Sequence, residues 1–179
     1  MELTTDRLVI RRATSEESNQ ISAQISGDSV DDYLASLSKE DIAVIFQDQN
    51  AVSALLTRFS NSIGDCNSEI YGAWKEDTLI GFIALVNGES GTPELQIEIA
   101  PSFQNRGYGF EFLKALLVYL FEHKDFKYVR YTVMPNNKSS ISLVNHIGAL
   151  LQAPKSEAER LLICTYHITK ESMDSQQAH

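Results

Sequence analysis

The sequence predicts a mixed α/β (α+β) domain in which helices flank one central sheet. Residues 94–99 alternate polar and apolar side chains, as expected for a strand with one buried face. Apolar residues then recur at helical spacing from Phe110 to Phe121, which predicts a long amphipathic helix. Strand and helix patterns follow one another along the rest of the chain, and this order is typical of helices packed on a single sheet.

The first half of the chain predicts one strand, several helices and a hairpin. A strand is expected over residues 7–12, and Thr14 offers a cap for a helix over residues 17–26. Further helices are expected from Val30 to Leu37 and from Ile42 through the fifties, with a break near residues 48–50 left open. These helices are expected to form one wall of a substrate cleft. A β-hairpin follows, with strands over residues 69–74 and 79–86.

The second half predicts strands that alternate with helices. Pro101 ends the strand at 94–99, because proline lacks the backbone donor that a ladder needs. After the long helix, a strand is expected at 127–134, a turn and cap at 135–140, and a short helix stopped by Gly148. A last strand is expected at 161–168, and the polar residues 170–179 are expected to fray.

Length and charge limit the classes of function. With 179 residues and 20.0 kDa, the chain suits one domain, taken as residues 1–169, with residues 170–179 as a polar C-terminal tail. The formal net charge of −9 argues against binding to nucleic acid or to an anionic membrane. The same charge would attract a cationic or amine substrate.

Cysteine and histidine usage predicts no metal site. Cys66 and Cys164 show no ligand pattern, and the four histidines are scattered without ligand spacing. A reducing compartment is the simpler interpretation, with Cys164 as a buried strand residue. No apolar run reaches membrane-spanning length and the first residues lack signal-peptide features, so the cytoplasm is the expected location.

The turn between the strand at 94–99 and the long helix has the composition of an anion site. It reads Gln104-Asn105-Arg106-Gly107-Tyr108-Gly109, and its glycines allow positive φ or a close approach to a ligand. The free N–H groups of a helix start bind anions, and Arg106 adds a guanidinium. The turn lacks the Gly-Lys-Ser/Thr of a Walker A loop and the three glycines of a dinucleotide fingerprint. This pattern predicts a pyrophosphate cradle.

The order Gln-x-x-Gly-x-Gly, after a strand ending in proline and before a long helix, resembles the acyl-CoA loop of the GNAT N-acetyltransferase superfamily. The opening residues 3–11 are similar to the Thr-x-Arg-Leu-x-Leu-Arg start of the RimJ/RimL branch, to which Asn137 followed by Ser140 also belongs. The resemblance covers the chain from Thr5 to Thr169. It implies acetyl-CoA as donor and a primary amine as acceptor, on a protein N-terminus or a small molecule. It also implies direct attack in a ternary complex, by a monomer or homodimer.

The resemblance assigns roles residue by residue. Backbone groups of Ile97, Glu98 and Ile99 would pair with the pantetheine arm, and Ile99 would polarise the thioester carbonyl. Either Glu94 or Glu98 would take the proton of the amine, and Ser140 would help to protonate the thiolate. The residues expected to bind CoA are Ile97, Glu98, Ile99, Gln104, Asn105, Arg106, Gly107, Tyr108, Gly109, Asn137 and Ser140.

Two departures from the family pattern keep other interpretations open. Val144 stands where many GNAT enzymes carry a tyrosine general acid, and Asn105 stands at a position that is often glycine. Asn137 and Ser140 also suit plain helix caps, and Glu94 and Glu98 suit a solvated strand face. A CoA-binding sensor or regulatory module without catalysis is therefore an alternative, and a nucleotide-binding domain that uses the same turn is a weaker one.

Overall fold

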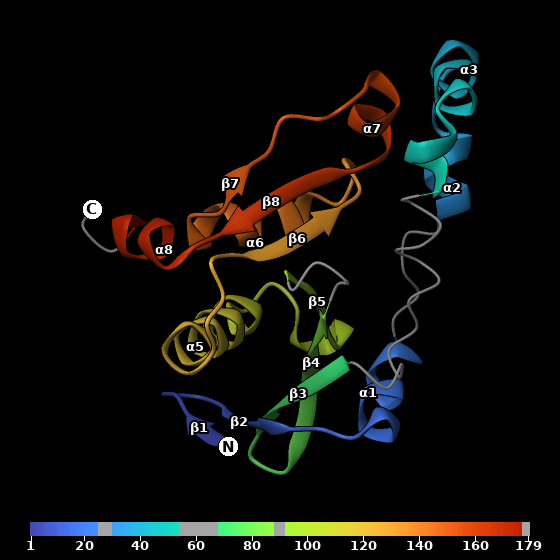
Figure 1. Cartoon of the computed structure of the whole chain (residues 1–179). Helices are drawn as coiled ribbons and strands as arrows, with labels where there is room; N and C mark the ends of the chain where they lie inside the picture. Colours follow the sequence, from blue (N-terminus) through green and yellow to red (C-terminus); the bar gives the residue numbers. More distant parts are fainter. Residues whose placement is uncertain (25–29, 54–67, 88–91, 177–179) are drawn as a thin grey trace.

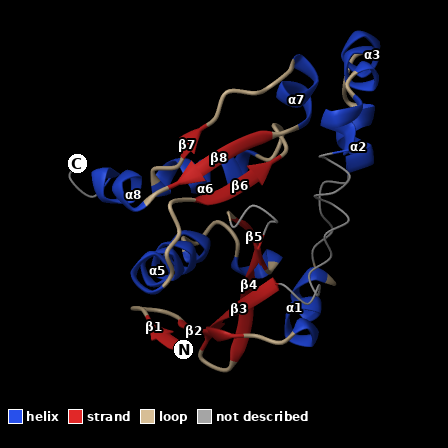
Figure 2. Ribbon diagram, in the orientation of Figure 1, coloured by secondary structure: helices blue, strands red, loops and turns tan. Residues whose placement is uncertain are grey.

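The computed structural model of the chain describes residues 1–24, 30–53, 68–87 and 92–176. These residues form an eight-stranded sheet in the order β1-β2-β3-β4-β5-β6-β8-β7 (Figures 1 and 2). Neighbouring strands are antiparallel except β5 and β6, which are parallel. The strands are β1 Glu2–Thr4, β2 Val9–Arg12, β3 Ser68–Lys75, β4 Thr78–Asn87, β5 Pro93–Ile99, β6 Val129–Val133, β7 Leu150–Leu151 and β8 Cys164–Ile168. The predicted fold class is confirmed.

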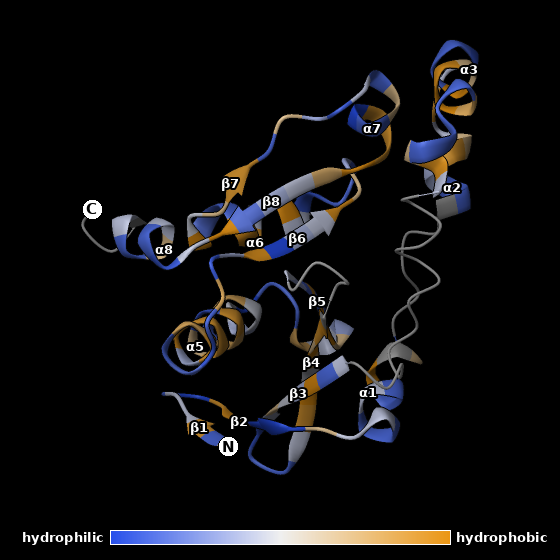
Figure 3. Cartoon of the chain, viewed as in Figure 1, coloured by the Kyte–Doolittle hydropathy of each residue, from blue (hydrophilic) through white to orange (hydrophobic). Residues whose placement is uncertain are grey.

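Helices cover both faces of this sheet, with α5 on one face and α1 on the other. The helices of the described residues are α1 Ser15–Ser22, α2 Val30–Ala35, α3 Lys39–Gln47, the 3₁₀ turn η1 Pro101–Phe103, α5 Tyr108–His123, α6 Lys138–Ile147, α7 Glu157–Leu162 and α8 Lys170–Gln176. The main core lies between the sheet and α5, whose apolar residues Phe112, Leu113, Leu116, Leu117 and Leu120 are fully buried. Figure 3 shows the apolar colouring along β4 and on α5.

The opposite face of the sheet carries α1 and a smaller cluster. Ile21 of α1 packs there with Ile70, Phe82, Ala84 and Ala100. The N-terminus of α1 is fixed by a capping box, because Thr14 accepts from the Glu17 backbone and the Glu17 carboxylate accepts from the Thr14 backbone. The helix begins two residues earlier than the pattern predicts, at Ser15.

A third cluster joins α3 to the C-terminal part of the chain. Ile45 and Ala51 pack against Ala158 and Leu162, and the Tyr33 hydroxyl donates to the Leu161 carbonyl. The chain breaks after α3 at Asp48, whose carboxylate accepts from the backbones of Asn50 and Ala51 and restarts the helix at residues 49–53. The break left open near residues 48–50 therefore exists.

The sequence prediction is wrong at residues 161–162. They end α7 instead of opening a strand, and β8 begins only at Cys164. Ser156 caps α7 by accepting from the Glu159 backbone, and Leu162 is buried against α3. An apolar run of this length fits a buried helix end as well as a strand, so its periodicity does not decide between them.

The predicted frayed tail is also wrong for residues 170–176, which form α8. Thr169 caps this helix, and Met173 is buried in the main core. The short edge strands β1 and β7 are further elements that the sequence pattern did not indicate. Cys66 lies outside the described residues, whereas Cys164 is a half-buried residue of β8 with a free thiol.

We expect Leu117→Ala to lower the free energy of unfolding by about 2–5 kcal/mol, because it leaves a cavity under the sheet. Val118 is the next residue of α5 and is 40% exposed, so Val118→Ala is the matched control and should change stability by less than about 1 kcal/mol. Urea denaturation of both variants measures the difference. Equal losses would contradict the placement of the core on this face of α5.

Candidate active site

The glycine turn leaves the start of α5 open. Asn105 and Gly107 both have left-handed backbone conformations, with φ of 58° and 81°, and Gly107 is the N-cap residue. Within the described part of the chain, no side chain caps this helix start. The N–H groups of the first helical turn are therefore presented to solvent at the positive end of the helix dipole. Residues 104–107 are exposed, as an anion site requires.

Strand β5 has an open backbone edge beside this turn. It pairs with β4 along residues 93–99 but with β6 only at Glu94 and Leu95, among the described residues. Beyond this point the two parallel strands separate (Figure 1). The edge of β5 that faces β6 therefore has no partner strand at Ile97 and Ile99.

The register decides which residues face the open edge. The Ala100 N–H donates to the Ile80 carbonyl at 2.8 Å, so even-numbered residues of β5 bond to β4 in the regular antiparallel alternation. Ile97 and Ile99 consequently direct their backbone groups away from β4, into the gap between β5 and β6. By the same alternation, the backbone of Glu98, opposite Phe82, is directed toward β4.

The Gln104 side chain links the turn to the end of this strand. Its amide donates to the Ile99 carbonyl at 2.8 Å. This contact occupies the Ile99 carbonyl, and the Ile99 N–H remains the backbone donor at the open edge nearest to the turn. Gln104 thus holds the strand end and the turn together.

The turn, the strand end and α6 meet at Gly109. A Cβ atom placed on Gly109 would lie 3.6 Å from Ile99 Cγ1 and 3.8 Å from Leu143 Cδ2. Three separate motifs of the sequence therefore come together at one point. The structure brings the glycine turn, the end of β5 and the middle of α6 together around Gly109.

On α6, Asn137 acts as the N-cap and Ser140 follows in the first turn. The Asn137 side-chain oxygen accepts from the Ser140 N–H at 3.0 Å, which is the capping role that the sequence left as an alternative. Ser140 is half-buried. Val144 is fully buried in the main core and supplies no proton donor.

The acidic residues of β5 lie on the opposite face from the main core. Glu94 and Glu98 share the face of α1 with Gln96, because side chains alternate along a strand. Arg130, the partner of Glu94 on β6, places its Nε 3.1 Å from the Glu94 carboxylate. His167 pairs with Arg130 on β8, and its pKa is lowered by burial and then by the charge of Arg130. Glu94 is thus part of a row of polar side chains across three strands, in which Glu94 and Arg130 form an ion pair.

The segment before β2 contributes residues that the sequence analysis missed. Thr5 and Arg7 donate to the carboxylate of Glu111, which lies in the first turn of α5. Burial raises the pKa of Glu111, but these hydrogen bonds together outweigh it and lower the pKa. The available signal was the Thr5-x-Arg7-Leu8 pattern, although nothing in it indicates a partner about a hundred residues away.

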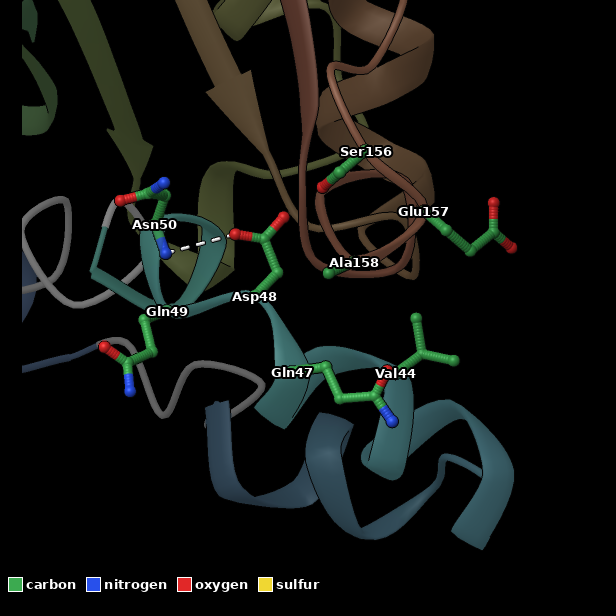
Figure 4. Close-up of a pocket in the computed structure, with 8 residues that line it drawn as sticks. All are labelled: Val44, Gln47, Asp48, Gln49, Asn50, Ser156, Glu157 and Ala158. Atoms are coloured by element: carbon green, nitrogen blue, oxygen red, sulfur yellow. Dashed lines mark hydrogen bonds between the residues drawn. The ribbon is translucent and has the colours of Figure 1, made fainter.

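A separate pocket of about 610 Å³ lies between the end of α3 and the start of α7 (Figure 4). Its lining residues are Val44, Gln47, Asp48, Gln49, Asn50, Ser156, Glu157 and Ala158. The pKa of Asp48 is lowered, first by the nearby Ser156 hydroxyl and then by the backbone N–H of Ala51. None of the predicted site residues lies in this pocket, so it is distinct from the site at the glycine turn.

Two further findings concern only the described residues. They contain no cluster of histidine, cysteine, aspartate or glutamate that could hold a metal ion. None of their helices is both long and apolar enough to cross a lipid bilayer.

Comparison with known proteins decides the family. The sequence model of the acetyltransferase (GNAT) domain matches residues 7–150, which is most of the chain. The chain belongs to the GNAT acetyltransferase family. It is therefore an acyltransferase, and GNAT acetyltransferases use acetyl-CoA as the acetyl donor. No curated protein matches the chain.

Solved structures of GNAT enzymes share the fold. An acetyltransferase of the GNAT family from Bacillus anthracis is similar, with a TM-score of 0.62, 20% identity, and 96% and 99% of the two chains covered. A spermidine N-acetyltransferase SpeG variant from Vibrio cholerae has a TM-score of 0.64 and 15% identity, with 97% of this chain and 99% of that chain covered. The ribosomal L7/L12 α-N-protein acetyltransferase RimL in complex with coenzyme A has a TM-score of 0.60 and 15% identity, with 96% and 99% covered.

We expect Gly107→Ala to destabilise the protein by about 1–2 kcal/mol, because a Cβ atom is strained at a φ of 81°. Gly109→Ala is the control, since its Cβ would make only ordinary contacts and its backbone has no positive φ. Thermal unfolding of both variants makes the comparison. A Gly107→Ala protein as stable as wild type would show that the turn does not need this conformation.

We expect Glu111→Gln to lower the free energy of unfolding by about 1 kcal/mol near pH 7, allowing for the exposed Arg7 partner. The pKa of Glu111 is lowered in the folded state, so its contribution is complete above the unfolded pKa of about 4.3. The contribution is lost as the pH falls through the folded pKa. Urea denaturation at several pH values should therefore show the difference from wild type closing in acid.

The control is Glu122→Gln, which removes one negative charge from an exposed position of the same helix. It should change stability near pH 7 by less than about 0.5 kcal/mol. A difference between Glu111→Gln and wild type that stays constant down to pH 3 would contradict the ionised role of Glu111.

Proposed function

We propose that this GNAT protein transfers an acetyl group from acetyl-CoA to a primary amine. The observation that carries the proposal is the open edge of β5 at Ile97 and Ile99, directly beside the uncapped start of α5. Backbone amides at a strand edge suit the two amide groups of a pantetheine arm, and helix-start N–H groups suit a diphosphate. The residues present therefore fit CoA.

The proposed donor site uses residues of three elements. The N–H groups of Gly107, Tyr108 and Gly109, together with Asn105 and the Arg106 guanidinium, would hold the diphosphate. Ile97 and Ile99 would pair with the pantetheine amides, and Gln104 would keep the strand end in place. Ser140 and Asn137 of α6 would border the thioester end of the site. Acetyl-CoA supplies an activated acetyl thioester when bound.

The proposed chemistry is direct acyl transfer in a ternary complex. The ammonium of the acceptor loses a proton to a carboxylate, and the neutral nitrogen attacks the thioester carbonyl carbon. A C–N bond forms, the C–S bond breaks, and the CoA thiolate leaves. The nitrogen releases its second proton as the amide forms, and this balances the proton that the thiolate takes up. The Ile99 N–H would stabilise the negative charge that develops on the carbonyl oxygen. Ser140 would pass a proton to the thiolate, because Val144 offers none.

Glu98 is the better candidate for the base. One oxygen of Glu94 contacts the Arg130 guanidinium of β6 at 3.1 Å, so that carboxylate already has a cationic partner. Glu98 shares the polar face of β5 and directly precedes Ile99, the proposed oxyanion donor. The acceptor would accordingly approach over the face that carries α1, where acidic side chains attract an ammonium.

The acceptor class follows from charge and from similar enzymes. The protein carries a net charge of −9, which favours a cationic acceptor. RimL is named for acetylation of a protein N-terminus and SpeG for acetylation of spermidine. These names support an amine acceptor, on a protein or on a small molecule.

The burial of Val144 in the core favours a second candidate function. Without a phenol at that position, the protein could bind CoA as a sensor or regulatory module and not catalyse transfer. This candidate predicts CoA binding without acetylation of any amine in a broad panel. A single efficiently acetylated amine would exclude it.

Isothermal titration with acetyl-CoA tests donor binding, and Arg106→Ala should weaken binding by about tenfold through loss of a phosphate contact. Thiol release with a panel of peptides and polyamines tests transfer. Glu98→Gln should lower kcat/KM by about 10²–10⁴ and Glu94→Gln by less. Absence of binding at ligand concentrations on the order of 1 mM would refute the proposed function.

A further inference from the structure

The short connection between β1 and β2 is folded onto the glycine turn. The Thr5 N–H donates to the Leu8 carbonyl at 2.9 Å, and the Leu8 N–H donates to the Thr5 hydroxyl at 3.0 Å. Leu8 is 2% exposed and anchors this connection in the main core. The backbone at Arg7 is consequently held in one position beside α5.

The Arg7 side chain contacts Arg106 and Tyr108 and lies beside Gly107 between them. Its Nη1 donates to the Arg106 carbonyl at 3.0 Å, and its guanidinium lies 4.5 Å from the centre of the Tyr108 ring. A Cβ atom on Gly107 would lie 3.3 Å from its Nη2. Arg7 therefore packs against the turn from outside, on the residues whose N–H groups open toward the proposed diphosphate.

Glu111 fixes the other side of the same guanidinium. Arg7 Nε and Nη2 each lie 2.6 Å from Glu111 Oε2, and the Arg7 backbone N–H donates to Oε1 at 3.1 Å. Thr5 donates to Oε1 as well, at 2.5 Å. Both carboxylate oxygens are thus engaged, and the Glu111 side chain is only 16% exposed. This fork geometry is specific to arginine.

The ion pair between Arg7 and Glu111 also changes the charge next to the glycine turn. Glu111 lies in the first turn of α5, where a carboxylate would repel a bound diphosphate. The positive charge of Arg7 balances that carboxylate. The positive end of the helix dipole and the Arg106 charge then act on the ligand without opposition from Glu111.

We propose that Arg7 is a positioning residue for CoA, which acts through the backbone of the glycine turn. The inference rests on the proposed function, because it concerns the diphosphate of the same donor. Arg7 itself would not contact the CoA diphosphate. It holds the turn in its left-handed conformation and neutralises Glu111.

A purely structural ion pair is the competing explanation. The Arg7 side chain is 43% exposed, and exposed ion pairs add little to stability. A pair with only this role would contribute a small amount to the free energy of unfolding and would leave the affinity for CoA unchanged. Donor affinity is therefore the measurement that separates the two explanations.

The experiment compares wild type, Arg7→Ala, Arg7→Lys and the control Arg160→Ala. Arg160 forms an exposed ion pair with Glu157 on α7, with both side chains 57% exposed, away from the turn. Titration with CoA should give a Kd about tenfold higher for Arg7→Ala, and a wild-type Kd for Arg160→Ala. Arg7→Lys keeps the charge but loses the fork, so its Kd should fall between the two. Thermal unfolding of each variant checks that it is folded at the assay temperature.

Kinetics with a truncated donor supply the second readout. With acetyl-CoA, Arg7→Ala should raise KM and leave kcat within about twofold. With acetyl-pantetheine, which lacks the diphosphate, KM should equal that of wild type. Equal losses with both donors, or a wild-type Kd for CoA in Arg7→Ala or in a folded Arg7→Lys protein, would overturn the inference. Failure of wild type to bind CoA would instead overturn the proposed function.

Discussion

The arrangement of the site depends on where β5 stops pairing with β6. A backbone N–H or C=O group costs free energy when it is buried without a partner, so a strand edge that is not paired must meet water or a ligand. The described residues pair β5 with β6 only at Glu94 and Leu95. The backbone groups of Ile97 and the N–H of Ile99 on that edge therefore face no partner strand, whereas Gln104 occupies the Ile99 carbonyl. The glycine turn begins within a few residues of this edge. The uncapped helix start and the open strand edge consequently follow one another along the chain, as the proposed site for a ligand with a diphosphate at one end and amides along its arm requires.

Local patterns in the sequence predicted the strand, turn and helix of this site. Contacts between residues far apart in the sequence determine how these elements are placed and paired. The alternation at 94–99 and the glycine turn are properties of adjacent residues, so periodicity and turn chemistry were enough to predict them. The backbone assignment of Glu98 depends on the ladder with β4, which no short window contains. The contacts of Arg7 with Glu111 link positions about a hundred residues apart, and a single sequence gives no signal for such a pair. At residues 161–162, Ser156 was the local signal for a helix, but the apolar run that follows equally fits a strand.

The two faces of β5 differ in chemistry. Leu95, Ile97 and Ile99 face the apolar core with α5, whereas Glu94 and Glu98 face α1. Positive charge gathers at the turn beyond the end of the strand, in a chain that is acidic as a whole. An anionic donor and a cationic acceptor would thus be attracted to different sides of the same strand, and neither would compete for the place of the other.

The attachment of α2 and α3 has a mechanical consequence. These helices follow α1 in the sequence, yet Tyr33 bonds to the Leu161 carbonyl and Ile45 packs on Leu162, next to β8. Helix α1 instead packs on β3, β4 and β5. The helices that precede β3 in the sequence are therefore divided between two parts of the molecule. Helix α1 lies with β3, β4 and β5, and α2 and α3 lie with α7 beside β8. Any rotation of β6 and β8 relative to β5 would carry α2 and α3 with it while α1 stayed with β5. A change in the separation of β5 and β6 would in this way also change the distance of α2 and α3 from α1.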